Sequence, residues 1–295
     1  AGFSPAPDKG GEQNAMPILT SQQISEYYER FKNVEVTFTK EVIRATGLLT
    51  KMIYLKGLGS QWPCIVYSCS MTSAKVIASI NPETYGKIRE ANNLVSLRFA
   101  FRDADKVDPV LFFVSAKVTG YNPYNKEKPN LNFVSLEFTK RPPNDLIAVL
   151  GQILDAASNS QKRREERITL DVQTVKKLGL QSKGSQVYIQ GVPRNCIIRD
   201  LSFSGAKVII SGVAKFLLEK EATLTLETVD NEVISVKGKT IRHEPVEGRK
   251  DLAAIAIKFD QDSIPMEYKL IINDYLRQQQ RKRVALNDEP AQDST

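Results

Sequence analysis

Hydrophobic and polar residues alternate along most of the chain, and this period of two is typical of strands with one buried face. About seven runs of this kind lie between Val34 and Phe138, separated by turn residues such as Asn81-Pro82. A parallel sheet would need crossover helices, and this region has room only for a short one near Pro82–Glu90. The pattern therefore predicts an antiparallel barrel or sandwich.

A second β-rich region extends from Ile168 to Phe259 and contains seven further candidate strands. No clear internal sequence repeat relates the two regions. Together they predict an all-β fold class with two antiparallel β-barrel domains, accompanied by a connecting helix and a C-terminal helix.

Three stretches have helical rather than strand periodicity. A capping box at Thr20–Gln23 begins a short helix that ends near Phe31. A connecting helix with one apolar face follows Pro143 and ends near Asn159. After Pro265 the hydrophobic period returns to that of a helix.

These patterns divide the chain into five parts. The predicted parts are a disordered tail over 1–17, an N-terminal β domain over 18–143, a connecting helix and linker over 144–160, a second β domain over 161–264, and a C-terminal helix with a polar tail over 265–295. The first part is expected to be disordered because it is rich in Gly, Pro and polar residues.

The composition excludes several classes of protein. The chain has 41 Lys and Arg against 34 Asp and Glu, and the net charge of +7 favours an anionic partner. His243 is the single histidine, and the three cysteines form no CxxC pair, so a zinc site is not expected. With no GxxxxGK[ST] loop either, we predict a protein that is not an enzyme and uses no cofactor.

The sequence also indicates the cellular compartment in which the protein is expected. No apolar run has the length of a membrane span, and no secretory signal precedes the first helix. A small, odd number of cysteines suits a reducing compartment. We therefore expect a cytoplasmic protein without membrane insertion.

Two short motifs open the second β region. The first is an RxxxR formed by Arg163 and Arg167, and the second is a DxSxxG formed by Asp200, Ser202 and Gly205. Guanidinium groups donate in pairs to phosphate oxygens and can stack on a base. The Asp200 carboxylate could accept from a guanine, and Ser202 could add a hydroxyl. Gly205 permits a turn or a close backbone approach, so the set suits an anionic guanine nucleotide.

The order RxxxR, strand, DxSxxG resembles the PilZ domain family, and the resemblance covers about Gln161–Asp274. It implies a six-stranded barrel that binds cyclic di-GMP. By position, the resemblance implies that Arg163 and Arg167 grip phosphates and stack on guanine, that Asp200 and Ser202 contact a guanine base, and that Gly205 shapes the turn.

Charged residues within and beside the RxxxR motif also affect the expected ligand binding. Lys162 lies where many relatives carry another basic residue, so it is expected to affect how many ligand molecules bind. Arg164 lies inside the motif, and its direction stays open. Glu165 and Glu166 add negative charge beside an anionic site, which would reduce affinity.

The first β region lacks the paired motifs. Arg98 and Arg102 have RxxxR spacing, but no DxSxxG follows them. The order of domains resembles the companion domain that precedes PilZ in flagellar-brake-like proteins. This resemblance implies that the first domain contacts a partner or packs on the second domain, without binding the nucleotide in the family's way.

The resemblance implies a bacterial cyclic di-GMP receptor whose domain arrangement changes when ligand orders a loose linker, Asn159–Arg167. It also implies a protein partner, such as flagellar or motility machinery, and a role in motility or virulence. Two alternatives stay open. The basic segment Arg277–Arg283 would suit a nucleic-acid-binding barrel protein, although the concentration of charge in two clusters makes nucleic acid a less favoured partner. The other alternative is a PilZ-fold scaffold without ligand.

Overall fold

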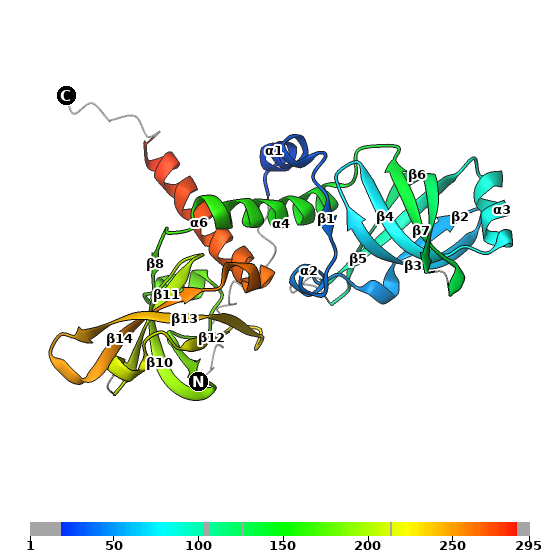
Figure 1. The fold of residues 1–295 in the computed structure, drawn as a ribbon. Coiled ribbons are helices and arrows are strands. Elements are labelled where there is room, and N and C mark those ends of the chain that lie inside the picture. The colour runs from blue at the N-terminus through cyan, green and yellow to red at the C-terminus, as the bar shows by residue number, and fades with distance from the viewer. Residues whose placement is uncertain (1–18, 103–106, 126, 213, 288–295) are drawn as a thin grey trace, which may run out of the picture.

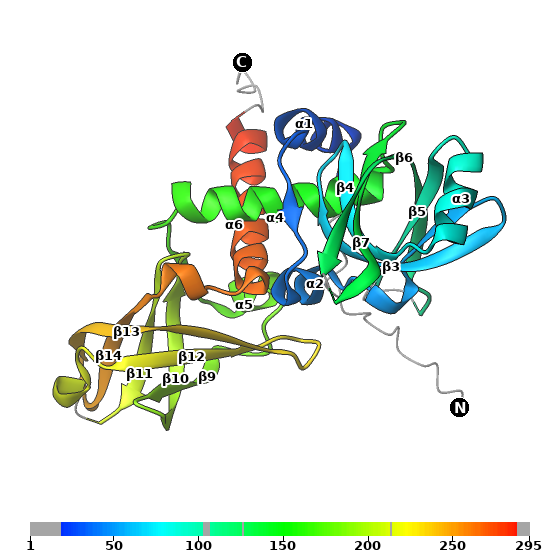
Figure 2. The ribbon, with the colours of Figure 1, turned by 45° about the vertical axis from the view of Figure 1, so that its right-hand side comes forward.

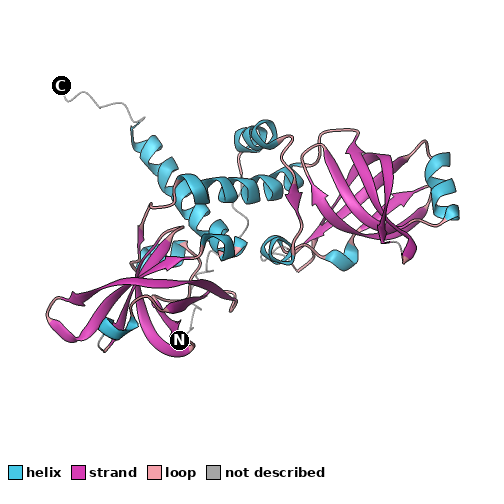
Figure 3. Cartoon of the chain, in the orientation of Figure 1, coloured by secondary structure: helices cyan, strands magenta, loops and turns pink. Residues whose placement is uncertain are grey.

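The computed structural model describes residues 19–102, 107–125, 127–212 and 214–287, and the expected disordered tail over 1–17 lies outside this range. Alternation of buried and exposed side chains closes each β region into a barrel, because the apolar face of the sheet must meet itself. Figures 1 and 3 show the two barrels on either side of a group of helices. The predicted fold class is confirmed.

Six antiparallel strands form the first barrel. They are β2 (Tyr54–Gly57), β3 (Ser60–Cys69), β4 (Ser73–Ser79), β5 (Leu94–Phe101), β6 (Val110–Asn125) and β7 (Lys128–Phe138). Their order is β3-β2-β5-β6-β7-β4, and pairing of β3 with β4 closes the ring. A two-residue strand, β1 (Val36–Thr37), adds to β3. The helix expected near Pro82 is α3 (Pro82–Glu90).

The second barrel repeats this plan. Its strands are β9 (Gly184–Ile189), β10 (Val192–Leu201), β11 (Gly205–Ser211), β12 (Glu221–Glu227), β13 (Val233–Val246) and β14 (Arg249–Phe259). Their order is β10-β9-β12-β13-β14-β11, closed between β10 and β11, and the short β8 (Ile168–Thr169) adds to β10.

The shared plan reveals an internal repeat that the sequence pattern did not suggest. Strand β3 begins at Ser60, and its counterpart β10 begins 132 residues later at Val192. At the same offset, the sequence AKVI occurs over 74–77 and again over 206–209. Both β-hairpins that enter these strands turn through two residues of positive φ, Leu58-Gly59 and Gln190-Gly191, as the twist of the strands favours. The expectation of no repeat was therefore wrong.

The remaining elements are helical. The α-helices are α1 (Ser21–Phe31), α2 (Lys40–Thr46), α4 (Asn144–Lys162), α5 (Val172–Lys177) and α6 (Met266–Asn287). Single-turn 3₁₀ helices cover Thr50–Met52, Ala214–Leu217 and Gln261–Ser263. The capping box predicted for α1 is present. Within the described ranges, no helix is both long and apolar enough to cross a membrane.

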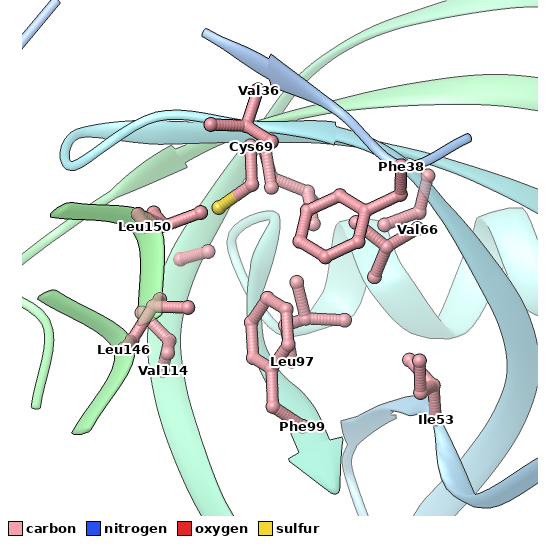
Figure 4. Close-up of a cluster of buried hydrophobic side chains, with 14 of the residues drawn as sticks. Val36, Phe38, Ile53, Val66, Cys69, Leu97, Phe99, Val114, Leu146 and Leu150 are labelled. Carbon is pink, nitrogen blue, oxygen red and sulfur yellow. The ribbon is translucent and has the colours of Figure 1, made fainter. Parts of the chain in front are cut away.

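Each barrel has its own hydrophobic core, and each core includes one long helix. Helix α4 buries Leu146 and Leu150 in the first core, beside Leu97 and Val114 of the strands, as Figure 4 shows. Helix α6 buries Tyr268 and other residues in the second core. Because α4 also contacts α6, the two helices join the barrels (Figures 1 and 2).

A buried carboxylate lies where α1, α4 and α6 meet. Asp155 of α4 accepts from Arg30 Nη1 of α1 at 3.0 Å and from Arg277 Nη1 of α6 at 2.9 Å. Asn273 Nδ2 and Asn159 Nδ2 donate to the same carboxylate at 3.0 and 3.2 Å. Four donors satisfy a side chain that is only 4% exposed, as a buried charge requires.

Close packing and a second ion pair tighten this junction. A Cβ on Gly151 of α4 would lie 2.2 Å from Cδ2 of Tyr27 of α1, so only glycine allows the two helices to approach this closely. Arg44 of α2 pairs with Glu267 of α6, which adds another link between the first barrel and α6.

Replacing the buried carboxylate should weaken the junction. Asp155→Ala leaves Arg277, whose side chain is 18% exposed, without its carboxylate. We expect the free energy of unfolding to fall by about 3 kcal/mol, measured by urea denaturation. Asp145→Ala, at an exposed position of the same helix, is the matched control and should cost well under about 1 kcal/mol. Equal losses in the two variants would contradict this role of Asp155.

Candidate functional site

The DxSxxG segment forms the connection from β10 to β11, and Ser202 holds it closed. The Ser202 backbone N–H donates to the Gly205 carbonyl at 2.8 Å, and the Ser202 hydroxyl accepts from the Gly205 N–H at 3.1 Å. Ser202 is fully buried. The structure thus places Ser202 as an internal support of the turn, and its direct contact with a guanine stays a prediction.

Gly205 allows a close backbone approach. A Cβ at this position would lie 2.3 Å from the carbonyl oxygen of Ile257 on the neighbouring strand β14. The sequence left a turn or a close approach open for Gly205, and in the structure Gly205 both closes the turn with Ser202 and allows the close approach to Ile257.

Asp200 lies near the end of strand β10 and forms an ion pair with Arg167. The strand β10 carries a bulge between Ile198 and Asp200, and a bulge re-aims the side chain that follows it. Arg167 directly precedes β8, which pairs with β10 next to Asp200. The Arg167 Nη1 group donates to the Asp200 carboxylate, and the two side chains are 42% and 17% exposed. This pair brings together one residue of each motif.

Tyr268 of α6 forms a hydrogen bond to the DxSxxG turn. Its hydroxyl donates to the Ser202 carbonyl at 2.8 Å. Burial, and then the negative charge of Asp200, raise the pKa of Tyr268, so the hydroxyl remains a donor. Tyr268 lies in the helix that the sequence predicts after Pro265, and the hydrophobic pattern alone does not indicate this contact.

Arg163 lies at the end of α4 and binds Glu166 in a fork. Its Nε donates to Glu166 Oε2 at 2.7 Å and its Nη2 to Oε1 at 3.0 Å. The backbone between them is a hydrogen-bonded turn, since the Glu166 N–H donates to the Arg163 carbonyl at 3.1 Å. The linker expected to be loose therefore consists, in this structure, of helix up to Lys162 followed by a turn.

Arg164 and Lys162 differ in their surroundings. The Arg164 carbonyl accepts from the Ser204 N–H at 3.2 Å, which ties the linker to the DxSxxG turn. The Arg164 side chain approaches Glu165 at 3.7 Å and is 42% exposed. Lys162 lines a cavity beside Arg163, so it is closer than Arg164 to the space that a ligand could fill.

This cavity lies among α1, α4 and α6 and has a volume of about 620 Å³. Its lining includes Arg30, Lys162, Arg163, Glu166 and Arg277. The lining does not include Arg167 or Asp200. The structure therefore places the two motif arginines apart, with Arg163 at the helix junction and Arg167 on the barrel edge.

The first barrel contains a turn equivalent to the DxSxxG turn, but with different charged residues beside it. At the 132-residue offset, Ser70 corresponds to Ser202, and its hydroxyl accepts from the Ser73 N–H at 3.1 Å in the same way. Glu35 stands in the place of Arg167 and Ser68 in the place of Asp200, and the two are hydrogen-bonded. With Phe31 in the place of Arg163 and Glu35 in the place of Arg167, the first barrel lacks both motif arginines at this turn.

The comparisons with known proteins agree with this architecture. Residues 161–278 match the PilZ domain, which defines the class of the second barrel. Residues 22–157 match the PilZN3 domain. The cyclic di-GMP binding protein of Treponema denticola is 45% identical over 261 residues, covering 88% of this chain and 83% of that protein. The chain therefore belongs to the PilZ family, among the members that join a PilZN3 domain to a PilZ domain.

Two solved structures are also similar. PlzA of Borreliella burgdorferi, in complex with c-di-GMP, is 26% identical with a TM-score of 0.39, covering 86% of this chain and 98% of that chain. YcgR of Escherichia coli, in complex with c-di-GMP, is 13% identical with a TM-score of 0.29, covering 84% of this chain and 91% of that chain.

The close approach at Gly205 can be tested. Gly205→Ala places a methyl group against the Ile257 carbonyl, so we expect a loss of about 2 kcal/mol or more in the free energy of unfolding. Gly120→Ala is the matched control, because a Cβ on this strand glycine of the other barrel meets nothing within 4 Å. Thermal or urea denaturation measures both variants. A Gly205→Ala protein as stable as the Gly120→Ala protein would refute the steric argument.

Proposed function

We propose that this protein is a cyclic di-GMP receptor. The observation that carries the proposal is the Arg167–Asp200 pair, which joins the two motifs at the barrel edge. The relative from Treponema denticola, a cyclic di-GMP binding protein, supports it. Arg163, which lines the cavity beside α4, is the second cation in our proposed site.

In our proposal, each group takes the role that its chemistry suits. Arg163 and Arg167 donate paired hydrogen bonds to phosphate oxygens and can stack on a base. Asp200 accepts from the N1–H and amino group of a guanine, which adenine does not present in the same form. Ser202 and Gly205 hold the turn beneath these groups. Lys162 and Arg164 adjust the charge around the site.

A receptor needs no catalytic group, and the environment of the cysteines agrees with that role. Burial raises the pKa of the Cys64 and Cys196 thiols to about 12, so neither is a ready nucleophile. Within the described part of the chain, no three His, Cys, Asp or Glu residues cluster as metal ligands.

We further propose that ligand changes the arrangement of the barrels. Helix α4 packs in the first core, holds Asp155 at the junction and ends at Lys162, directly before Arg163. A ligand that takes Arg163 from Glu166 would act at one end of this helix. It shifts the arrangement only as far as it binds one arrangement better than the other. The output would be a changed surface for a protein partner in the cytoplasm, for example in motility or virulence.

Calorimetric titration with cyclic di-GMP tests the ligand and its site. Arg163→Ala and Asp200→Ala should each weaken binding by at least about tenfold, because each removes charged hydrogen bonds to the ligand. Arg249→Ala, which breaks an exposed ion pair with Asp251 in the same barrel, is the control and should bind as the parent does. Cyclic di-AMP and GTP should compete poorly.

Two outcomes would refute parts of this proposal. Absence of binding by the parent protein at micromolar concentration would remove cyclic di-GMP as the ligand. Binding by the parent together with unchanged affinity in both Arg163→Ala and Asp200→Ala would mean that the site lies elsewhere.

Small-angle X-ray scattering tests the change in arrangement. We expect the radius of gyration or the distance distribution to differ between the ligand-free and the cyclic di-GMP-saturated protein. At a ligand concentration near the dissociation constant of the parent, the Arg163→Ala protein should change its profile less than the parent does. Identical profiles for the parent protein with and without saturating ligand would count against rearrangement.

A further inference from the structure

We propose that Glu166 is a built-in competitor of the ligand for Arg163 and thereby sets the affinity of the site. This inference rests on the proposed function. Glu166 lies inside the RxxxR segment. Its carboxylate accepts hydrogen bonds from the N–H groups of Arg163 that a phosphate would otherwise bind.

The geometry of the pair resembles the way in which arginine holds a phosphate. Two parallel hydrogen bonds of 2.7 and 3.0 Å join the Arg163 guanidinium to the two carboxylate oxygens of Glu166. Arginine forms the same bidentate contact with phosphate oxygens. A ligand phosphate and the Glu166 carboxylate therefore compete for the same donors.

The competitor is always close to its target. Glu166 lies three residues after Arg163, in a turn held by the hydrogen bond from the Glu166 N–H to the Arg163 carbonyl. Little chain entropy is lost when such a local pair forms. Both side chains line the cavity beside α4, and Arg163 is only 23% exposed. The pair is therefore accessible from this cavity, whose lining also includes Glu26 and Asp155.

The two motif arginines differ in this respect. Arg167 pairs with Asp200, and Asp200 belongs to the proposed site, where it reads a guanine. Glu166 makes no ligand contact in the proposed site, and its one ion-pair partner among the described residues is Arg163. Removing the charge of Glu166 should therefore free Arg163 without removing a ligand contact.

The size of the effect follows from the fraction of protein in which Arg163 is free. The apparent dissociation constant equals the intrinsic constant divided by that fraction. Partly exposed ion pairs of good geometry are moderately strong, so we expect Glu166→Gln to lower the dissociation constant about threefold to tenfold. Glutamine keeps the shape of the side chain and loses its charge.

Glu165→Gln is the matched control. It removes the same formal charge from the same turn, yet its carboxylate is 75% exposed and lies 3.7 Å from Arg164 rather than on Arg163. A general electrostatic effect on an anionic ligand would appear equally in both variants. Competition for Arg163 would appear in Glu166→Gln alone.

The experiment is calorimetric titration of the parent, Glu166→Gln and Glu165→Gln proteins with cyclic di-GMP and, separately, with inorganic pyrophosphate. We expect Glu166→Gln to bind both probes more tightly than the other two proteins. Equal affinity of Glu166→Gln and the parent, or an equal gain in both variants, would overturn the inference.

The second probe separates this inference from the proposed function. If cyclic di-GMP fails to bind any of the three proteins while Glu166→Gln gains affinity for pyrophosphate, the competition stands and the proposed ligand is wrong. If none of the three proteins binds either probe, both proposals fail.

Discussion

The arrangement of the two barrels depends on one buried carboxylate, that of Asp155. Its partners come from α1 before the first barrel and from α6 after the second. A buried charge is costly unless it is paired and hydrogen-bonded, so positions of the helices that lose these donors are unfavourable. The same environment affects Asp274, because burial and then Asp155 raise the pKa of this neighbour to about 7. The junction is thus a defined contact between domains that each have their own core.

The repeated barrel separates what supports the fold from what supports binding. Both barrels keep a serine that closes the turn with its hydroxyl, Ser70 in the first and Ser202 in the second. Only the second barrel places arginine beside this turn, whereas the first has Glu35. A common scaffold therefore carries different chemistry through a few exposed side chains.

The sequence predicted the two barrels and the capping box of α1, because periodicity and local spacing determine these features. Contacts between distant segments were not predictable in this way. Helix α4 was expected to end near Asn159, yet it continues to Lys162, because Asn159 hydrogen-bonds to Asp155 and Asn273. The ion pairs of the motif arginines likewise depend on which side chains the fold brings together. The repeat was hidden because only short identical stretches survive.

In the proposed rearrangement, helix α4 would act as a lever between the barrels. Its 19 residues form a rod of about 28 Å, fixed in the first core near one end and bearing Lys162 at the other. A tilt of roughly 10° would move the far end of such a rod by roughly 5 Å, about the spacing between neighbouring strands. A rearrangement small enough to keep both cores packed could therefore displace one barrel by a strand's width relative to the other, which is enough to uncover or mask a surface.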